Sequence, residues 1–112
     1  MSNIPRLTIK GKSGEAYTFY IYPLPVKFKK TGGVFLYTKR EAIRKHHYIF
    51  LGTTNDLSLP LVNELAEEIK QYGPTHLCAF TETSEEKRKS IEDDILAVIT
   101  TLSNAQLSEK IN

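Results

Sequence analysis

Basic side chains gather in the first half of the chain, where they could bind phosphate groups. Residues 1–47 carry ten Lys or Arg against two acids, whereas residues 48–112 carry five against eleven. Cations of this kind bind a nucleic-acid backbone, so the asymmetry indicates DNA or RNA as a candidate partner. A solvated basic sheet beside acidic helices is the alternative explanation. The candidate phosphate contacts are Lys27, Lys29, Lys30, Lys39, Arg40, Arg44 and Lys45.

Two adjacent histidines and one cysteine are the other residues whose types suggest chemistry. Neighbouring residues on a strand point to opposite faces, so His46 and His47 are not expected to chelate one ion, and no cysteine is near them. The single cysteine, Cys78, lies in the apolar run HLCAF, where a buried and unreactive thiol is expected. These residues therefore predict neither a zinc site nor a cysteine nucleophile.

Most of the basic residues belong to, or lie beside, the segment Thr31–Gly52, TGGVFLYTKREAIRKHHYIFLG. Two apolar, β-branched and aromatic runs, residues 33–38 and 47–52, flank a charged connection, which predicts a β-hairpin. The connection, residues 39–47, contains good helix formers, so a short helical turn is expected at its tip. A solvated basic loop or a phosphate-contacting loop would both suit this composition.

Each strand of this hairpin carries a pair of aromatic residues. Side chains two residues apart share a face of a strand, so Phe35 is expected beside Tyr37. By the same spacing, Phe50 is expected beside Tyr48. The hairpin is therefore predicted to present one aromatic pair on each strand.

The rest of the chain predicts an α+β protein. Residues 7–9 and 16–24 read as an N-terminal hairpin, because they are rich in β-branched and aromatic residues around the glycine-containing turn GKSGE. A helix beginning near Ser58, a strand at residues 75–81 and a helix beginning near Ser84 follow. The sequence thus predicts a small central sheet, antiparallel or mixed, with two helices.

Length and composition predict a single domain without a membrane-spanning segment. A chain of 112 residues is the size of an ordinary domain, so we expect residues 1–112 to form a single domain. No apolar run is long enough to span a bilayer, and the first residues lack the apolar middle of a secretory signal. We therefore expect a cytoplasmic protein without a membrane partner.

Gly33-Val34-Phe35 followed by Phe50-Leu51-Gly52 resembles the two halves of the GIY-YIG nuclease signature, with phenylalanine replacing tyrosine in both halves. The predicted order of strand, strand, helix, strand and helix is also similar to that family. The resemblance covers residues 33–104 and leaves residues 1–30 as an added N-terminal hairpin. It places Glu92 where the family keeps its metal-binding glutamate, and Asn104 where many members keep an asparagine.

The resemblance implies that the family's chemistry has been lost. The family uses a tyrosine hydroxyl to help deprotonate water, an arginine on its first helix to stabilise charge, and the glutamate to hold a divalent cation. Phenylalanine has no hydroxyl, and the arginine position falls at Pro60. The loss of the positive charge of this arginine near the scissile group typically costs about a hundredfold in rate. We expect no cofactor, with Mg²⁺ or Mn²⁺ needed only if the chain is active.

A rearranged catalytic site is the alternative. If Tyr37 and Tyr48 share strand faces with the two phenylalanines, their hydroxyls could act beside Glu92 and Asn104. They would stand about 6 to 7 Å away from the family's position along the strand. Glu92 could instead be a surface acid in an ion pair with a neighbouring basic residue such as Lys89.

Three interpretations follow, in order of preference. The first is a catalytically degenerate GIY-YIG-like domain that binds nucleic acid or a protein partner. The second in rank is a small α+β interaction protein, such as a phage or mobile-element accessory factor, that shares only the fold. The third is an active metal-dependent endonuclease with a rearranged site.

Overall fold

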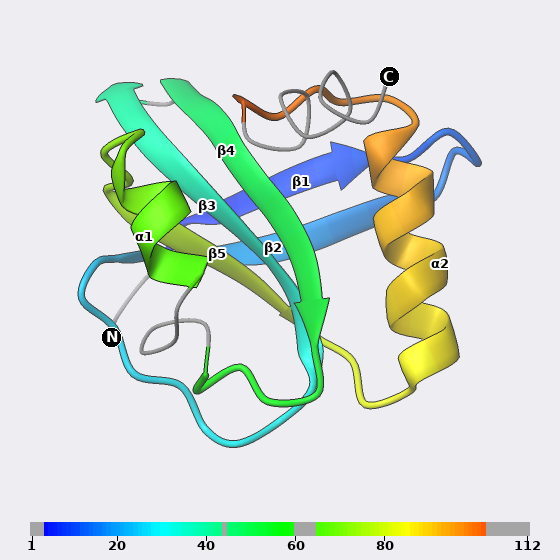
Figure 1. Ribbon diagram of the computed structural model, residues 1–112. Coiled ribbons are helices and arrows are strands. Elements are labelled where there is room, and N and C mark those ends of the chain that lie inside the picture. Colours follow the sequence, from blue (N-terminus) through cyan, green and yellow to red (C-terminus); the bar gives the residue numbers. More distant parts are fainter. Residues whose placement is uncertain (1–3, 44, 60–64, 103–112) are drawn as a thin grey trace.

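The computed structural model describes residues 4–43, 45–59 and 65–102, without the side chains of residues 65, 66 and 68. The described part is an α+β structure built on a curled sheet of five strands in the order β1-β2-β5-β3-β4 (Figure 1). Every pairing in the sheet is antiparallel. The elements are β1 (Arg6–Lys10), β2 (Ala16–Pro23), β3 (Gly33–Ala42), β4 (Lys45–Thr54), α1 (Leu65–Lys70), β5 (His76–Thr81) and α2 (Glu85–Leu96).

The central hairpin is confirmed, and it is longer than the sequence indicated. β3 and β4 remain paired as far as Ala42 and Lys45, so the expected helical turn at the tip is wrong. Strand pairing outweighs the local helix propensity here, since Arg40 pairs with His46 and its backbone N–H also bonds the Thr75 hydroxyl at 2.7 Å. The β-sheet therefore carries the basic tip outward as an extended ribbon.

A β-bulge in β4 changes which aromatic residues share a face. Tyr37 pairs with Phe50 but the next residue of β3 pairs with Tyr48, which leaves Ile49 as the extra residue. Phe50 therefore packs beside Phe35, with ring centroids 5.9 Å apart, while Tyr48 packs against the core on the other face. The prediction that Phe50 and Tyr48 share a face was wrong.

The two phenylalanine rings cover Gly52 at the end of this hairpin. A Cβ atom on Gly52 would lie 2.7 Å from Cε2 of Phe50 and 2.9 Å from Cζ of Phe35. Both distances are shorter than ordinary carbon contacts, so glycine is the residue that lets the rings approach the backbone. Phe35 is buried at 2% exposure as a result.

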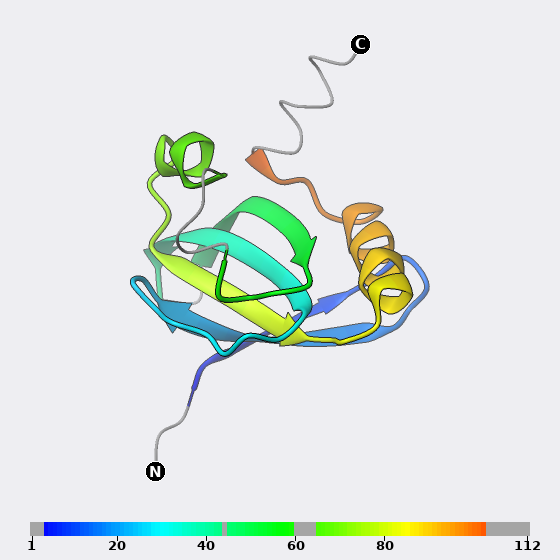
Figure 2. The ribbon, with the colours of Figure 1, turned by 60° about the horizontal axis from the view of Figure 1, so that its bottom comes forward.

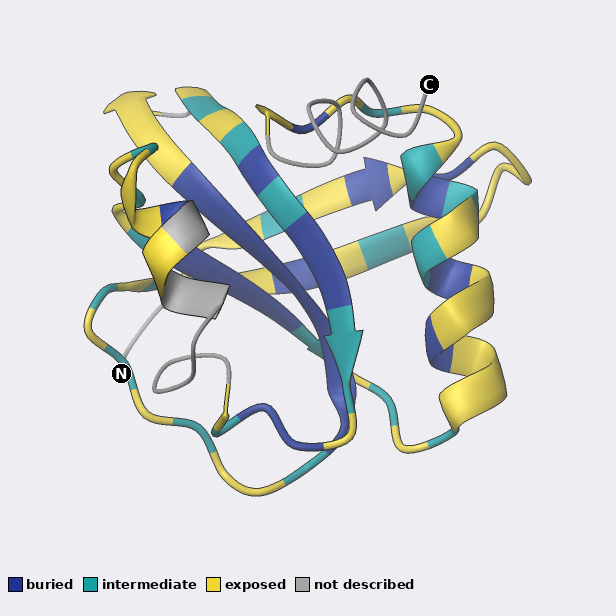
Figure 3. Cartoon of the chain, in the orientation of Figure 1, coloured by how far each residue is buried: buried dark blue, intermediate teal, exposed yellow. Residues whose placement is uncertain are grey.

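Two apolar clusters lie on opposite sides of β3. Val34 and Leu36 belong to the cluster beneath α2, together with Ile91 and Ile95 of that helix. Phe35 and Tyr37 belong to the second cluster, which includes Ile69 of α1 and Leu77 of β5. Figure 2 shows the two helices over different parts of the sheet, and Figure 3 shows the buried residues along its centre.

The N-terminal hairpin is an integral part of the sheet. β2 pairs with β5 as well as with β1, and Ile9, Phe19 and Ile21 enter the core beneath α2. Asp94 of α2 fastens the turn of this hairpin, because its carboxylate accepts hydrogen bonds from the Ser13 hydroxyl at 2.6 Å and the Tyr17 hydroxyl at 2.7 Å. The N-terminal hairpin, β1 and β2, therefore shares its core with the segment that resembles the nuclease family.

The helices agree with the sequence in part. α2 begins as predicted, with Ser84 as its N-cap and the Ser84 hydroxyl accepting from the backbone N–H of Lys87 at 3.3 Å. For the first helix, Ser58 lies in a turn, residues 60–64 are outside the described residues, and α1 is described from Leu65. No helix in the described part is long and apolar enough to cross a membrane.

Candidate functional site

A hollow of about 710 Å³ lies at the end of the sheet where the β3–β4 ribbon projects. Four basic side chains line it, and each comes from a different strand: Arg6 of β1, Arg40 of β3, His46 of β4 and His76 of β5. Apolar residues complete the wall, and no Asp or Glu is among the described residues that line it. We call this feature the basic hollow.

The two histidines form a defined pair within the basic hollow. Their rings meet edge to face, with centroids 5.1 Å apart. Nδ1 of His46 lies 2.9 Å from the Thr38 hydroxyl, and Nδ1 of His76 lies 2.7 Å from the Thr75 hydroxyl. Because each Nδ1 is engaged by a threonine, the Nε2 atoms are the ring nitrogens left for a ligand.

The surroundings of the pair favour uncharged imidazoles. Burial lowers the pKa of His46, and the neighbouring His76 and Arg40 lower it further. Burial also lowers the pKa of His76, again with a contribution from Arg40. Near neutral pH the fixed charge of the basic hollow therefore comes from Arg6 and Arg40, with the histidines as hydrogen-bonding groups.

Acidification is expected to destabilise the free protein through this pair. The pKa of both histidines is lower in the folded chain, so below about pH 6.5 the unfolded chain binds more protons and stability falls as the pH drops. Urea midpoints at about pH 7.5 and about pH 5.5 measure the effect. The double variant His46→Gln/His76→Gln should show a smaller change, because it lacks both histidines whose pKa is lowered in the folded chain, while His47 remains in both proteins. An equal change would contradict this assignment.

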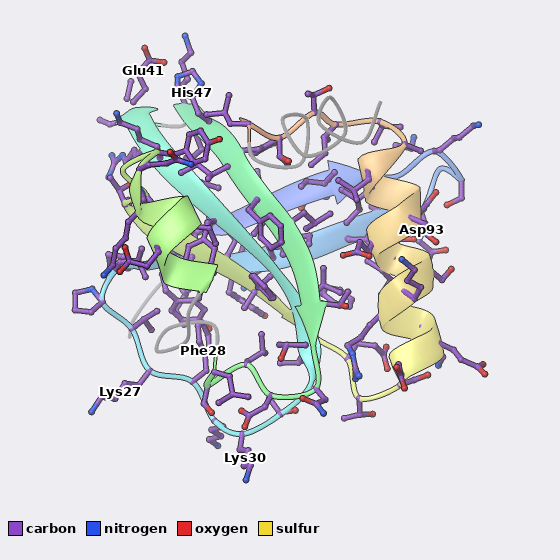
Figure 4. The ribbon with its side chains drawn as sticks, in the orientation of Figure 1. Lys27, Phe28, Lys30, Glu41, His47 and Asp93 are labelled. Atoms are coloured by element: carbon purple, nitrogen blue, oxygen red, sulfur yellow. The ribbon has the colours of Figure 1, made fainter. Side chains whose placement is uncertain are left out.

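The seven basic residues predicted to contact phosphate do not form one patch. Lys27 and Lys30 lie on the connection before β3, at the end of the sheet opposite the tip that carries Glu41 and His47 (Figure 4). The stretch of β3 between these ends, Gly33 to Lys39, spans about 20 Å at roughly 3.3 Å per residue. The basic residues are thus divided between two ends of the molecule.

Among the predicted contacts at the tip, Arg40 is the one that lines the basic hollow. Lys45 is 3.4 Å from Glu41, and that carboxylate also accepts from Nε2 of His47 at 2.7 Å. His47 therefore has a partner different from that of His46, as expected for neighbours on a strand. Lys39 is exposed, and Arg44 is outside the described residues.

At the opposite end of the sheet, Lys27, Lys29 and Lys30 belong to the connection between β2 and β3. Lys27 and Lys29 are exposed on either side of Phe28. Lys30 lies close enough to Asp56 to help hold the pKa of that carboxyl below its usual range, after the larger effect of the Ser58 hydroxyl. This group is therefore partly neutralised by a neighbouring acid.

The candidate catalytic residues are dispersed. Tyr37 is buried beneath α1, and burial raises its pKa to about 12, whereas Tyr48 packs on the face beneath α2. The side chain of Glu92 is 17% exposed and lies 3.4 Å from Nζ of Lys89. Asn104 is outside the described residues. The described side chains therefore do not bring both tyrosines to Glu92 on one face.

Glu92, the candidate metal ligand, and Cys78, the single cysteine, have surroundings that do not suit metal binding or nucleophilic chemistry. Within the described ranges, no group of three or more His, Cys, Asp or Glu side chains is arranged to hold a metal ion. Glu92, the metal-binding candidate, shares the ammonium of Lys89 with Asp93, at 3.4 Å and 3.7 Å. Cys78 is buried, and burial raises the pKa of its thiol to about 12, so the thiol is un-ionised at neutral pH.

Sequence reasoning missed Arg6 and His76 as members of a site. His76 lies thirty residues from His46, and only the placement of β5 beside β3 brings the rings together. Arg6 could have been found by pairing the predicted N-terminal strands across their turn, which sets Arg6 opposite Tyr20. No local motif indicates that Arg6 also lines the hollow to which Arg40 belongs.

The comparisons with known proteins supply no relative from which a role could be transferred. No family model, curated protein or solved structure matches this chain. The interpretation of the site therefore rests on the side chains and distances described above.

Proposed function

We propose that the chain is a catalytically inactive, GIY-YIG-like domain that binds nucleic acid through the basic hollow. The observation that carries this proposal is the convergence of Arg6, Arg40, His46 and His76 from four strands on one concave surface, where none of the described lining residues is a carboxylate. A concave surface of one charge sign concentrates the field and attracts anions. Phosphate groups are anions that the arginine and histidine side chains of the basic hollow can bind.

The chemistry of the four side chains suits phosphate oxygens. An arginine guanidinium presents a planar fork of donors that can bond two oxygens of one phosphate. Each imidazole has Nδ1 hydrogen-bonded to a threonine hydroxyl, and in the tautomer with its proton on Nε2 that nitrogen can donate to a further oxygen. Contacts of this kind to the nucleic-acid backbone fix the position of the protein and carry no base-sequence information.

Loss of cleavage is the second part of the proposal. Phe35 and Phe50, at the signature positions, have no hydroxyl to move a proton. Tyr37, the candidate on the same face, is a side chain 5% exposed, and Glu92 is engaged with Lys89. These surroundings support a binding role over a rearranged catalytic site.

Labelled single-stranded and double-stranded oligonucleotides test the proposal. Binding is expected at about 50 mM salt and should weaken steeply towards about 200 mM, because each phosphate contact releases counterions. Two phosphates neutralised by Arg6 and Arg40 would give a log–log slope of about −1.8 on a duplex, or about −1.4 on a single strand. The same oligonucleotides should remain intact with Mg²⁺ or Mn²⁺.

Two results would contradict the proposal. Absence of binding at the low salt concentration would retire the nucleic-acid role and leave a protein-interaction module, whose binding would depend weakly on salt. Cleavage that requires a divalent cation and disappears in Glu92→Ala would instead establish the active alternative.

A further inference from the structure

A second hollow, of about 300 Å³, lies on the sheet face where the N-terminal hairpin is open to solvent. Four aromatic side chains contribute to its wall: Tyr20, Tyr22, Phe28 and Phe80. Tyr20 is 43% exposed, whereas Tyr22 meets Phe28 edge to face with centroids 5.0 Å apart. We call this feature the aromatic hollow.

The surface around the aromatic hollow combines cations, hydroxyls and rings. Alternate residues of β1 and β2 point outward here, while Ile9, Phe19 and Ile21 point into the core beneath α2. Hydroxyls of the two strands meet at 3.1 Å between Thr8 and Thr18. Among the described residues, the outward-facing side chains of the two strands include no carboxylate: they are Arg6, Thr8 and Lys10 of β1 with Ala16, Thr18, Tyr20 and Tyr22 of β2.

Arg6 connects the aromatic hollow with the basic hollow. Its guanidinium carbon lies 5.6 Å from the centre of the Tyr20 ring, within the range of a cation–π contact. The same residue is among those that line the basic hollow. Leu7 and Ile21, on the inward face of the hairpin, also line the basic hollow, so a strand of nucleic acid that passed over the edge strand β1 would meet its cations and then the ring of Tyr20.

We propose that the nucleic acid bound by this protein is single-stranded, with phosphates in the basic hollow and an unpaired base stacked on Tyr20. This inference rests on the proposed function and specifies its ligand. In a duplex the faces of the bases are covered by their neighbours, whereas an unpaired base offers a π-face to an exposed aromatic side chain. Positive charge beside an aromatic platform is the combination by which proteins bind single strands without strong sequence preference.

The packing explains why Tyr20 is the base platform among the four rings. Phe80 contacts Tyr17 and Phe19 within the core cluster, and Phe28 packs against the second cluster and Tyr22. These rings therefore support the walls of the aromatic hollow. Tyr20 keeps its ring on the surface, where Arg6 and the hydroxyl of Thr18 border the position of a stacked base.

The test compares a labelled oligonucleotide of about 12 nucleotides with the duplex of the same sequence. Tyr20→Ala should weaken binding of the single strand about tenfold, the effect of one lost base stack, and should leave duplex binding within about twofold of the wild type. Tyr20→Phe, which keeps the ring, should retain single-strand affinity. Unfolding in urea checks that both variants of this exposed residue are folded.

The outcomes separate this inference from the proposed function. If wild-type protein binds single strand and duplex equally, and Tyr20→Ala changes neither, the single-strand inference is wrong while backbone binding stands. If Tyr20→Phe loses as much affinity as Tyr20→Ala, base stacking is also excluded, since the ring is present. If neither oligonucleotide binds at low salt, the proposed function and this inference both fail.

Discussion

Phe35→Tyr is expected to lower the free energy of unfolding by about 1–3 kcal/mol and to leave the protein without nuclease activity. The substitution restores the tyrosine of the signature that the sequence resembles. However, Phe35 is only 2% exposed, and its Cζ atom, where the hydroxyl would be attached, lies 2.9 Å from the position of a Cβ on Gly52. The added oxygen would therefore meet packed atoms in place of water or a substrate.

Phe50→Tyr provides the matched comparison for this experiment. Phe50 packs beside Phe35 but is only partly buried, so a hydroxyl there can reach solvent and the loss of stability should be smaller. Urea unfolding of the two variants measures the difference, and incubation of a labelled duplex with Mg²⁺ or Mn²⁺ measures cleavage. Unchanged stability of Phe35→Tyr, or metal-dependent cleavage by it, would contradict the expectation.

The hairpins could be predicted from the sequence because their patterns are local. Residues of alternating character in β2 and in β3 point to opposite faces, as the period of two predicts. The bulge could not be predicted in the same way. Ile49 and Phe50 are both apolar, so an alternation that slips by one residue still buries an apolar side chain, and the pattern alone does not show where it slips.

The basic hollow depends on strand order, which the local pattern does not encode. His46 and His76 meet because β5 inserts between β2 and β3, although β5 is the last strand in the sequence. Conversely, Lys30 and Lys39 are close in sequence but lie near opposite ends of β3. A count of charge along the chain therefore identified a basic half, while the sheet decides which of these charges can bind one ligand.

Removing both arginines of the basic hollow should weaken binding of a single-stranded oligonucleotide about 25-fold at 0.1 M salt, roughly fivefold for each lost phosphate contact. The log–log slope with salt should become shallower by about 1.4 in the double variant Arg6→Ala/Arg40→Ala. Both residues come from exposed strand positions, so the fold should be retained. The affinity should fall alike for different base sequences, because backbone contacts carry no base code.

The double variant Lys87→Ala/Lys89→Ala is the control, because it removes the same net charge from exposed positions on α2. If binding depended only on overall charge, both double variants would weaken it equally. If it depends on the basic hollow, the lysine variant should keep the wild-type slope, because α2 covers the opposite end of the core from the ribbon that carries Arg40 (Figure 1). Equal losses in the two variants would therefore remove the basic hollow as the binding site, even if the protein still bound nucleic acid through diffuse charge.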